Sequence, residues 1–269
     1  MPRIGSTPFA FPDFHGATRR LVLWNLAAFF ILALAQLAVP ATAGGLAISF
    51  AFSPGAFLHG ALWQPFTYSL VHLGLLGTLF ELLSLWFLAG FLENFHSASW
   101  ITGLYAASVL GTALGATALY AMGLAPLEGA PLAGCYGGIF GLLVAIGTLY
   151  GDVQFMLFPL PMGIKARYLA AIYALVTVAM LFGQQRMYAF AQLGGALAGL
   201  FFIRLAPRRG ITFLFSEQWY AVRNRYYRWK RRRAARKFEV YMRSQGRTVR
   251  FAGQGRPLDD DQNDKKRWN

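Results

Sequence analysis

Six long apolar stretches constrain the fold of this chain more than any other feature, because each is close to the length that a helix needs to cross a bilayer. A transmembrane helix needs about 20 mostly apolar residues. Of the 269 residues, 56% are hydrophobic and only 13% are charged, which is too apolar for an ordinary soluble domain. The sequence therefore predicts an all-α, polytopic membrane protein. The predicted spans are residues 20–41, 66–92, 98–122, 133–150, 167–183 and 187–205.

Charge is concentrated at the C-terminal end of the chain. Residues 21–205 hold four basic and four acidic side chains, whereas residues 206–269 hold 18 Lys and Arg against 6 Asp and Glu, a net charge of +12. A helix-start signal at Ser216 and Glu217 precedes a run dense in Arg, Tyr and Trp, so we expect a helix to about residue 247 and a disordered end after it. The predicted division is an N-terminal segment 1–20, a membrane domain 21–205 and a basic tail 206–269.

The positions of Lys and Arg predict the orientation, because cytoplasmic loops carry an excess of them close to the spans. Basic residues precede the first span, lie between the fourth and fifth, and follow the sixth. With six spans these segments fall on one side, so both termini are predicted to be cytoplasmic. No organelle-targeting pattern is present, and the expected location is a bacterial inner membrane.

The basic tail has the composition of a membrane-surface segment. Lys and Arg beside an anionic leaflet contribute about 1 kcal/mol each, and Trp and Tyr are enriched at membrane interfaces. No nucleic-acid recognition module accompanies the charges, so nucleic acid is not an expected partner. Anionic lipid is the predicted partner, and the predicted lipid contacts are Trp229, Lys230, Arg231, Arg232 and Arg233.

The predicted spans contain pairs of glycines at a spacing of four and the single cysteine of the chain. Small residues at this spacing allow two helix backbones to approach closely within a membrane. The pairs are Gly111 and Gly115, Gly137 and Gly141, and Gly195 and Gly199. The one cysteine, Cys135, excludes an intramolecular disulfide and any multi-cysteine metal site, and we expect it to be a buried, packed thiol. No metal site or cofactor is predicted.

Three motifs place polar residues where the predicted helices begin or pack. The first runs from Trp63 to His72 and leads into the second span, with Gly77 and Glu81 following His72. The second is Gly134-Cys135-Tyr136-Gly137-Gly138 at the start of the fourth span, and the third is Ala191-Gln192-Leu193-Gly194-Gly195 in the sixth. Together they resemble the rhomboid intramembrane protease family over about residues 60–203. The segment Phe158-Pro159-Leu160-Pro161-Met162, with Lys165, also resembles the loop before the fifth helix of that family.

The resemblance implies a six-helix rhomboid-like bundle and a serine-type peptidase site, from which the catalytic residues are missing. His72 matches the first histidine of the family pattern. Gly77 stands where the second histidine is expected and Glu81 where the asparagine is expected. Tyr136 occupies the position of the nucleophilic serine, and Gln192 occupies that of the general base.

These side chains cannot carry out the usual reaction. A rhomboid needs a hydroxyl activated by an imidazole and donors that face the oxyanion. A glutamine amide does not accept a proton near neutral pH, and an ionised Glu81 repels developing negative charge. The chain therefore resembles rhomboid pseudoproteases, which is the leading hypothesis: it binds transmembrane clients beside the second and fifth spans without cleaving them. The predicted client-binding residues are His72, Glu81, Tyr136 and Gln192.

Two other functions stay open at this point. One is an intramembrane peptidase that uses Cys135, or Tyr136 with Glu81, although no histidine is expected to pair with Cys135. The other is a structural subunit of a membrane complex that docks a partner through the basic tail. A carboxyl group near the middle of a membrane is costly and is a functional candidate by default, so Glu81 is expected either to serve the function or to form a hydrogen bond with Tyr136 or Gln192. For His72 the alternative to client contact is a hydrogen bond to the loop before the second span.

Overall fold

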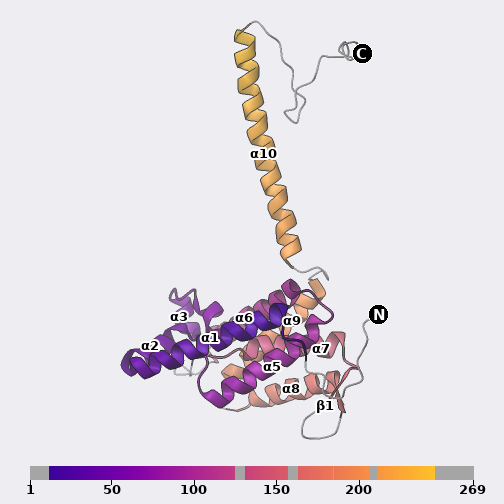
Figure 1. Cartoon of the computed structure of the whole chain (residues 1–269). Helices are drawn as coiled ribbons and strands as arrows, with labels where there is room; N and C mark the ends of the chain where they lie inside the picture. Colours follow the sequence, from indigo (N-terminus) through magenta and orange to yellow (C-terminus); the bar gives the residue numbers. More distant parts are fainter. Residues whose placement is uncertain (1–11, 125–130, 157–162, 184, 206–210, 246–269) are drawn as a thin grey trace. The chain divides into compact units, whose positions relative to one another are not determined.

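The helices of the chain form in the order that the apolar stretches predict. A computed structural model describes residues 12–124, 131–156, 163–183, 185–205 and 211–245. Contacts divide the chain into two units, Met1–Ile211 and Thr212–Asn269. The first unit contains the six helices that correspond to the predicted spans (Figure 1), which confirms the all-α polytopic fold. They are α1 Gly16–Ala38, α5 Leu75–Glu93, α6 Ala98–Ala121, α7 Tyr136–Leu149, α8 Ala166–Met180 and α9 Arg186–Leu205.

The second span begins later than the sequence predicts. A span from residue 66 was expected, but residues 64–70 form two short turns and α5 begins only at Leu75. The residue before it, Gly74, has φ +95°, a left-handed conformation that ends one helical segment and redirects the chain. The short elements that connect α1 to this point are α2 Pro40–Phe50, α3 Pro54–Leu58, α4 Gln64–Thr67 and the 3-10 turn η1 Tyr68–Leu70.

Two of the six helices are shorter than the hydrocarbon layer. Of the helices within the described residues, α1, α5, α6 and α9 are long and apolar enough to cross a membrane. The 14 residues of α7 and the 15 of α8 reach only about 21 and 22 Å at 1.5 Å per residue, against about 30 Å for the layer. A two-stranded antiparallel hairpin, β1 Gln154–Met156 and β2 Gly163–Lys165, lies between them.

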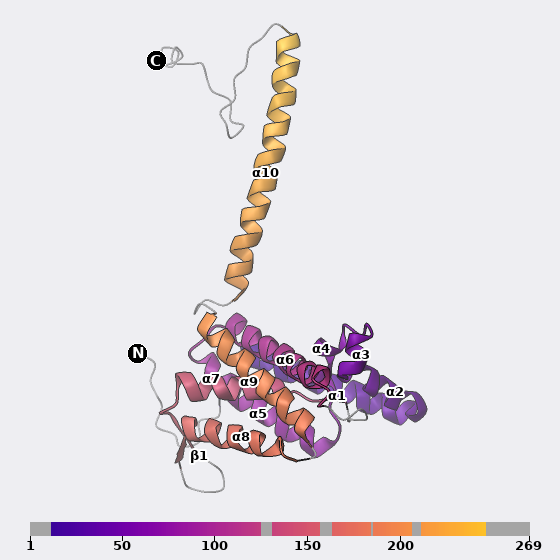
Figure 2. The same cartoon turned by 180° about the vertical axis from the view of Figure 1, so that it is seen from behind.

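Glycines bring α6, α7 and α9 into close contact, as their spacing predicts. A Cβ added to Gly194 would lie 2.9 Å from the Cα of Gly115, and one added to Gly199 would lie 3.1 Å from the Cα of Gly141. Neither position has room for a side chain without moving a backbone. The three helices run close together in the view from behind (Figure 2), and their close packing fixes the half of the bundle that carries Tyr136 and Gln192.

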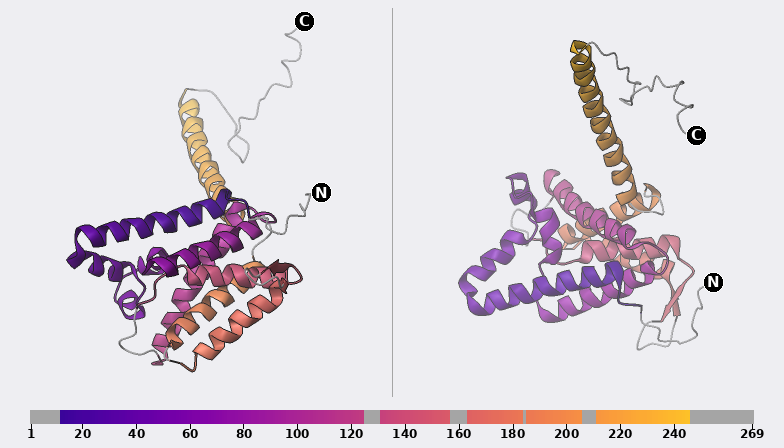
Figure 3. Two further views of the ribbon diagram at one scale, coloured as in Figure 1. Left: turned by 60° about the horizontal axis from the view of Figure 1, so that its bottom comes forward. Right: turned by 45° about the horizontal axis from the view of Figure 1, so that its top comes forward.

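On the other side of the bundle, α1 lies along α5 (Figure 3). Glu93, at the end of α5, accepts the N–H groups of Ala17 at 2.7 Å and Thr18 at 3.1 Å, and the Thr18 hydroxyl donates to it at 2.6 Å. The first N–H groups of a helix have no partner within the helix, so this carboxyl group caps α1.

The second unit contains one long helix, α10 Ile211–Ser244. Its described side chains between Arg223 and Arg233 are exposed. These include all five predicted lipid contacts, and the Arg233 guanidinium lies 5.3 Å from the centre of the Trp229 ring. The end that was predicted to be disordered lies outside the described residues.

Candidate functional site

The loop before α7 has a conformation that favours glycine. Backbone hydrogen bonds of 2.8 Å in both directions join Phe52 to Leu132, and the N–H of Gly134 donates to the carbonyl of Tyr68 at 3.1 Å. Gly134 has φ +95°, and a Cβ there would lie 2.7 Å from Oε2 of Glu81. A larger residue would therefore strain the backbone and displace the carboxyl group of α5.

Glu81 joins α5 to the beginning of α7 through Cys135. Cys135 donates its backbone N–H to Glu81 Oε2 at 2.8 Å, and its Sγ lies 3.4 Å from the same oxygen. Both residues are buried: Cys135 is 0% exposed and Glu81 is 6% exposed. The expectation of a buried, packed thiol is confirmed, and the thiol packs against a carboxyl group.

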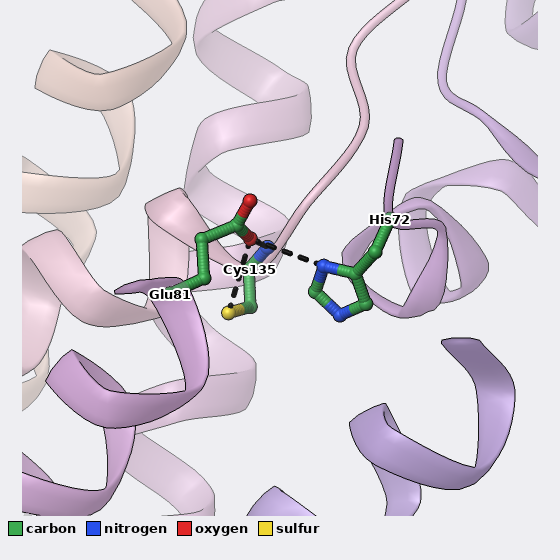
Figure 4. A group of neighbouring side chains, drawn as sticks. All are labelled: His72, Glu81 and Cys135. Atoms are coloured by element: carbon green, nitrogen blue, oxygen red, sulfur yellow. Dashed lines mark hydrogen bonds and ion pairs between the residues drawn. The ribbon is translucent and has the colours of Figure 1, made fainter. Parts of the chain in front are cut away.

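His72 extends this contact from α5 to α1. Its Nδ1 lies 3.2 Å from Glu81 Oε2, and its Nε2 lies 3.1 Å from Oδ1 of Asn25 in α1. The expected hydrogen bond to the loop before the second span is therefore corrected: the recorded partners of His72 belong to two helices. Figure 4 shows the imidazole, the carboxyl group and the cysteine pointing toward one another. His72 lies close to Cys135, since the candidate ligand atoms of all three residues lie within 4.8 Å of one another, but the contacts of His72 are with Glu81 and Asn25.

Tyr136 and Gln192 occupy the positions expected from the motifs but have different neighbours. Tyr136 is 43% exposed, and its side chain interacts with Glu81. Gln192 Oε1 accepts the hydroxyl of Thr177 in α8 at 3.2 Å. Within the described residues no hydrogen bond joins Gln192 to Tyr136 or to Glu81. The hydrogen bonds of the Glu81 carboxyl group go to Cys135, so the predicted hydrogen bond to Tyr136 stays a prediction, and the predicted alternative to Gln192 is absent within the described residues.

Gly77 faces open space, since no atom lies within 4 Å of a Cβ added there. Close packing therefore does not explain why this position is a glycine. Among the helices around it, α8 packs on α7 and α9, and α5 packs on α1 and α7, but α5 and α8 do not pack closely on each other. Both carry large exposed apolar side chains. These include Leu79, Phe80 and Leu83 in α5 and Ile172, Leu175 and Val176 in α8.

The sequence did not identify Asn25 or the pairing of Cys135 as parts of this site. Asn25 lies 47 residues before His72, and no local spacing connects the two. A signal was nevertheless present, because an asparagine inside an apolar span is itself a polar residue that needs a partner. The segment Phe158-Pro159-Leu160-Pro161-Met162 lies outside the described residues.

The bundle, its apolar spans and the buried polar group define an integral membrane protein of the helical class. A family model for the rhomboid domain matches residues 59–209. This match covers more than half of the chain, and the chain belongs to the rhomboid family. The family contains peptidases and inactive members. A comparison with curated proteins finds no match.

The arrangement lacks the parts of a serine peptidase at the matching positions. The amide of Gln192 cannot take a proton from a nucleophile, and it is engaged by Thr177. The backbone N–H of Cys135 already donates to Glu81, so it is not free to donate to an oxyanion. What the site offers instead is a set of buried hydrogen-bonding groups on α5 and at the start of α7.

Proposed function

We propose that this rhomboid-family protein binds transmembrane segments of other membrane proteins without cleaving them. The observation that carries the proposal is that no hydrogen bond joins Tyr136 to Gln192 within the described residues, and that Gln192 accepts the hydroxyl of Thr177 instead. The positions of nucleophile and base thus hold no proton acceptor for a tyrosine hydroxyl.

The loosely packed side between α5 and α8 supports the binding half of the proposal. Its apolar side chains suit the lipid-facing surface of a single-span client. Tyr136 is part-exposed at the beginning of α7, where its hydroxyl can form a hydrogen bond with a polar group of a client helix. His72, Glu81 and Gln192 complete the proposed client-binding set, with Glu81 holding Tyr136 from behind.

The surroundings of Cys135 favour the alternative function, an intramembrane peptidase. The thiol of Cys135 has a carboxyl group and an imidazole nearby, which are the groups that activate a nucleophile. Cys135 is completely buried, so a scissile carbonyl group has no access to the sulfur in this conformation. Non-cleaving binding therefore agrees better with the geometry.

The test uses purified protein in lipid vesicles with a fluorescent single-span peptide. Energy transfer from labelled protein reports binding, and gel electrophoresis of the same sample reports cleavage. The proposal predicts energy transfer with an intact peptide. Cleavage that disappears in Cys135→Ala, Tyr136→Phe or Glu81→Gln would establish the peptidase, and the absence of saturable energy transfer would remove the binding function.

The location and orientation that we propose follow the charges along the chain. Basic residues flank the predicted cytoplasmic ends of the spans, which supports cytoplasmic termini and a bacterial inner membrane. On the cytoplasmic face, the exposed Trp229, Lys230, Arg231, Arg232 and Arg233 of α10 would contact anionic lipid. The alternative, a tail that docks a protein partner, uses the same exposed helix.

Vesicle flotation separates these two roles of the tail. A peptide of residues 211–245 is compared on neutral vesicles and on vesicles containing phosphatidylserine. Binding only to the anionic vesicles, weakened in Arg231→Ser, Arg232→Ser, Arg233→Ser by about 1 kcal/mol per charge, supports lipid contact. Equal binding to both vesicle types, or none to either, contradicts it.

A further inference from the structure

The buried group formed by His72, Glu81 and Cys135 brings three kinds of metal-ligating atom together. Their ligand atoms lie within 4.8 Å of one another, with 3.2 Å from His72 Nδ1 to Glu81 Oε2 and 3.4 Å from that oxygen to Cys135 Sγ. All three residues are buried, and they come from three separate segments of the chain (Figure 4).

Hydrogen bonds around His72 fix which of its nitrogens carries a proton. Asn25 donates its Nδ2 to the carbonyl of Leu21 at 2.7 Å, which fixes the orientation of its amide. Its Oδ1 therefore faces His72 Nε2 at 3.1 Å, and this ring nitrogen must be the donor. In the neutral imidazole the other nitrogen, Nδ1, is then an acceptor.

The lone pair of His72 Nδ1 points toward another acceptor. Nδ1 is buried and has no hydrogen-bond donor among the described residues, and the atom next to it is Oε2 of Glu81. Two lone pairs this close repel each other unless a proton or a metal ion lies between them. The cysteine sulfur beside the same oxygen supplies a third ligand, which a shared proton does not need.

We propose that His72 Nδ1, Glu81 and Cys135 Sγ bind one divalent cation of the Zn²⁺ type. Zinc bonds of about 2.0 to 2.3 Å in a tetrahedron separate neighbouring ligands by about 3.3 to 3.8 Å, close to the 3.2 and 3.4 Å from Glu81 Oε2 to its two neighbours, and the His72 and Cys135 ligand atoms lie within 4.8 Å of each other. The ion, one carboxylate, one thiolate and a neutral imidazole sum to zero charge. A neutral assembly is far less costly in an apolar bundle than an unpaired carboxylate.

Two of the three ligands are oriented by a second contact, as metal ligands usually are. Asn25 holds the imidazole, the backbone N–H of Cys135 holds the carboxyl group, and the glycine conformation at Gly134 leaves room for that carboxyl group. Thiolate with imidazole favours zinc over Mg²⁺ or Ca²⁺, which prefer oxygen ligands only. Three protein ligands leave a fourth position for water or for the neighbouring Tyr136.

Binding involves a defined exchange of a proton. The S–H bond of Cys135 breaks so that the sulfur keeps the electron pair and donates it to the metal, and the proton passes to solvent. The sequence predicted no metal site, so the proposed site departs from that prediction. It does not rest on client binding, because it concerns only groups inside this chain.

Cobalt spectroscopy on the full-length protein tests the site directly. The protein is purified in detergent with a tag that contains no histidine, reduced, and titrated with Co²⁺. We expect a thiolate-to-Co²⁺ charge-transfer band that saturates at one equivalent and is displaced by one equivalent of Zn²⁺. Because the chain has one cysteine, a band in the unmodified protein comes from Cys135 whether or not any variant folds.

Variants then assign the other ligands. Cys135→Ser should remove the band, and His72→Gln and Glu81→Gln should each weaken Co²⁺ binding at least about tenfold. Asn25→Leu should have a similar effect, because it removes the hydrogen bond that orients the His72 imidazole. His59→Gln, at an exposed histidine after α3, is the matched control and should change nothing. The proposal is overturned if the reduced protein shows no band at saturating Co²⁺, if the band persists in Cys135→Ser, or if neither His72→Gln nor Glu81→Gln weakens binding.

Discussion

The two sides of this bundle are built in opposite ways. Where α6, α7 and α9 meet, glycines such as Gly194 and Gly199 leave no room for a single methyl group. By contrast, α5 and α8 do not pack closely on each other, a Cβ added to Gly77 of α5 would meet no atom within 4 Å, and α5 carries the buried carboxyl group of Glu81. The comparison teaches that the helices do not all need tight contacts: backbone contact fixes α6, α7 and α9, whereas α5 carries the buried carboxyl group of Glu81 and meets α8 loosely.

The largest expected effect comes from adding a side chain to the tight side. Gly194→Val should lower the free energy of unfolding by about 3 kcal/mol or more, because its methyl groups meet the backbones of Gly111 and Gly115. Unfolding by dodecyl sulfate in mixed micelles measures it. A loss below about 0.5 kcal/mol would mean that this interface is not close-packed.

A smaller effect is expected inside the polar group of the other side. Single replacements His72→Leu and Asn25→Leu should each cost about 1 to 3 kcal/mol, because each leaves a buried polar partner unsatisfied. A double-mutant cycle, measured with a chelator present, should give a coupling energy of about 1 kcal/mol. Additive effects would show that the two side chains do not interact.

The next prediction concerns Glu93, which lies at the other end of α5 from Glu81 and caps α1. Glu93→Ala should cost about 0.5 to 2 kcal/mol, the usual range for a lost helix cap, because the N–H groups of Ala17 and Thr18 lose their acceptor. Thr18→Ala removes one of the three hydrogen bonds and should cost less. The same unfolding assay compares them, and the reverse order would contradict the capping role.

The smallest expected effect is at Gly77 on the open side. Gly77→Ala should stabilise the protein by about 0.4 to 1 kcal/mol, because alanine restricts the unfolded chain and its methyl group meets no atom. Gly194→Ala is the matched replacement on the tight side and should destabilise it. Equal changes in the free energy of unfolding for Gly77→Ala and Gly194→Ala would contradict the difference in packing between the two positions.

The fold was largely predictable from the sequence because its determinants are local. Apolar length identified the six helices, and the four-residue glycine spacing identified the close contacts of α6, α7 and α9. The start of α5 was missed because apolar residues continue before it, at Leu70, Val71 and Leu73. The preceding turn ends at Leu70, where Val71 has an extended backbone, and α5 begins only after Gly74.

The candidate site was only partly predictable, because it depends on contacts between distant segments. The residues at the family positions, His72, Glu81, Tyr136 and Gln192, were found by the resemblance of their motifs to those of the rhomboid family. The pairing of Glu81 with Cys135 depends on the path of the loop through Gly134, and the partner of His72 comes from α1. Neither follows from spacing along the chain.

The measurement that tests the client-binding claim most directly is site-specific photo-crosslinking to a single-span peptide in vesicles. A photoreactive phenylalanine replaces Tyr136, at the start of α7, or Phe30, an aromatic residue of α1 that is 55% exposed. The account predicts a saturable crosslink to intact peptide from position 136 and only unsaturable background from position 30. Equal crosslinking from both positions, or a cleaved peptide at position 136, would contradict it.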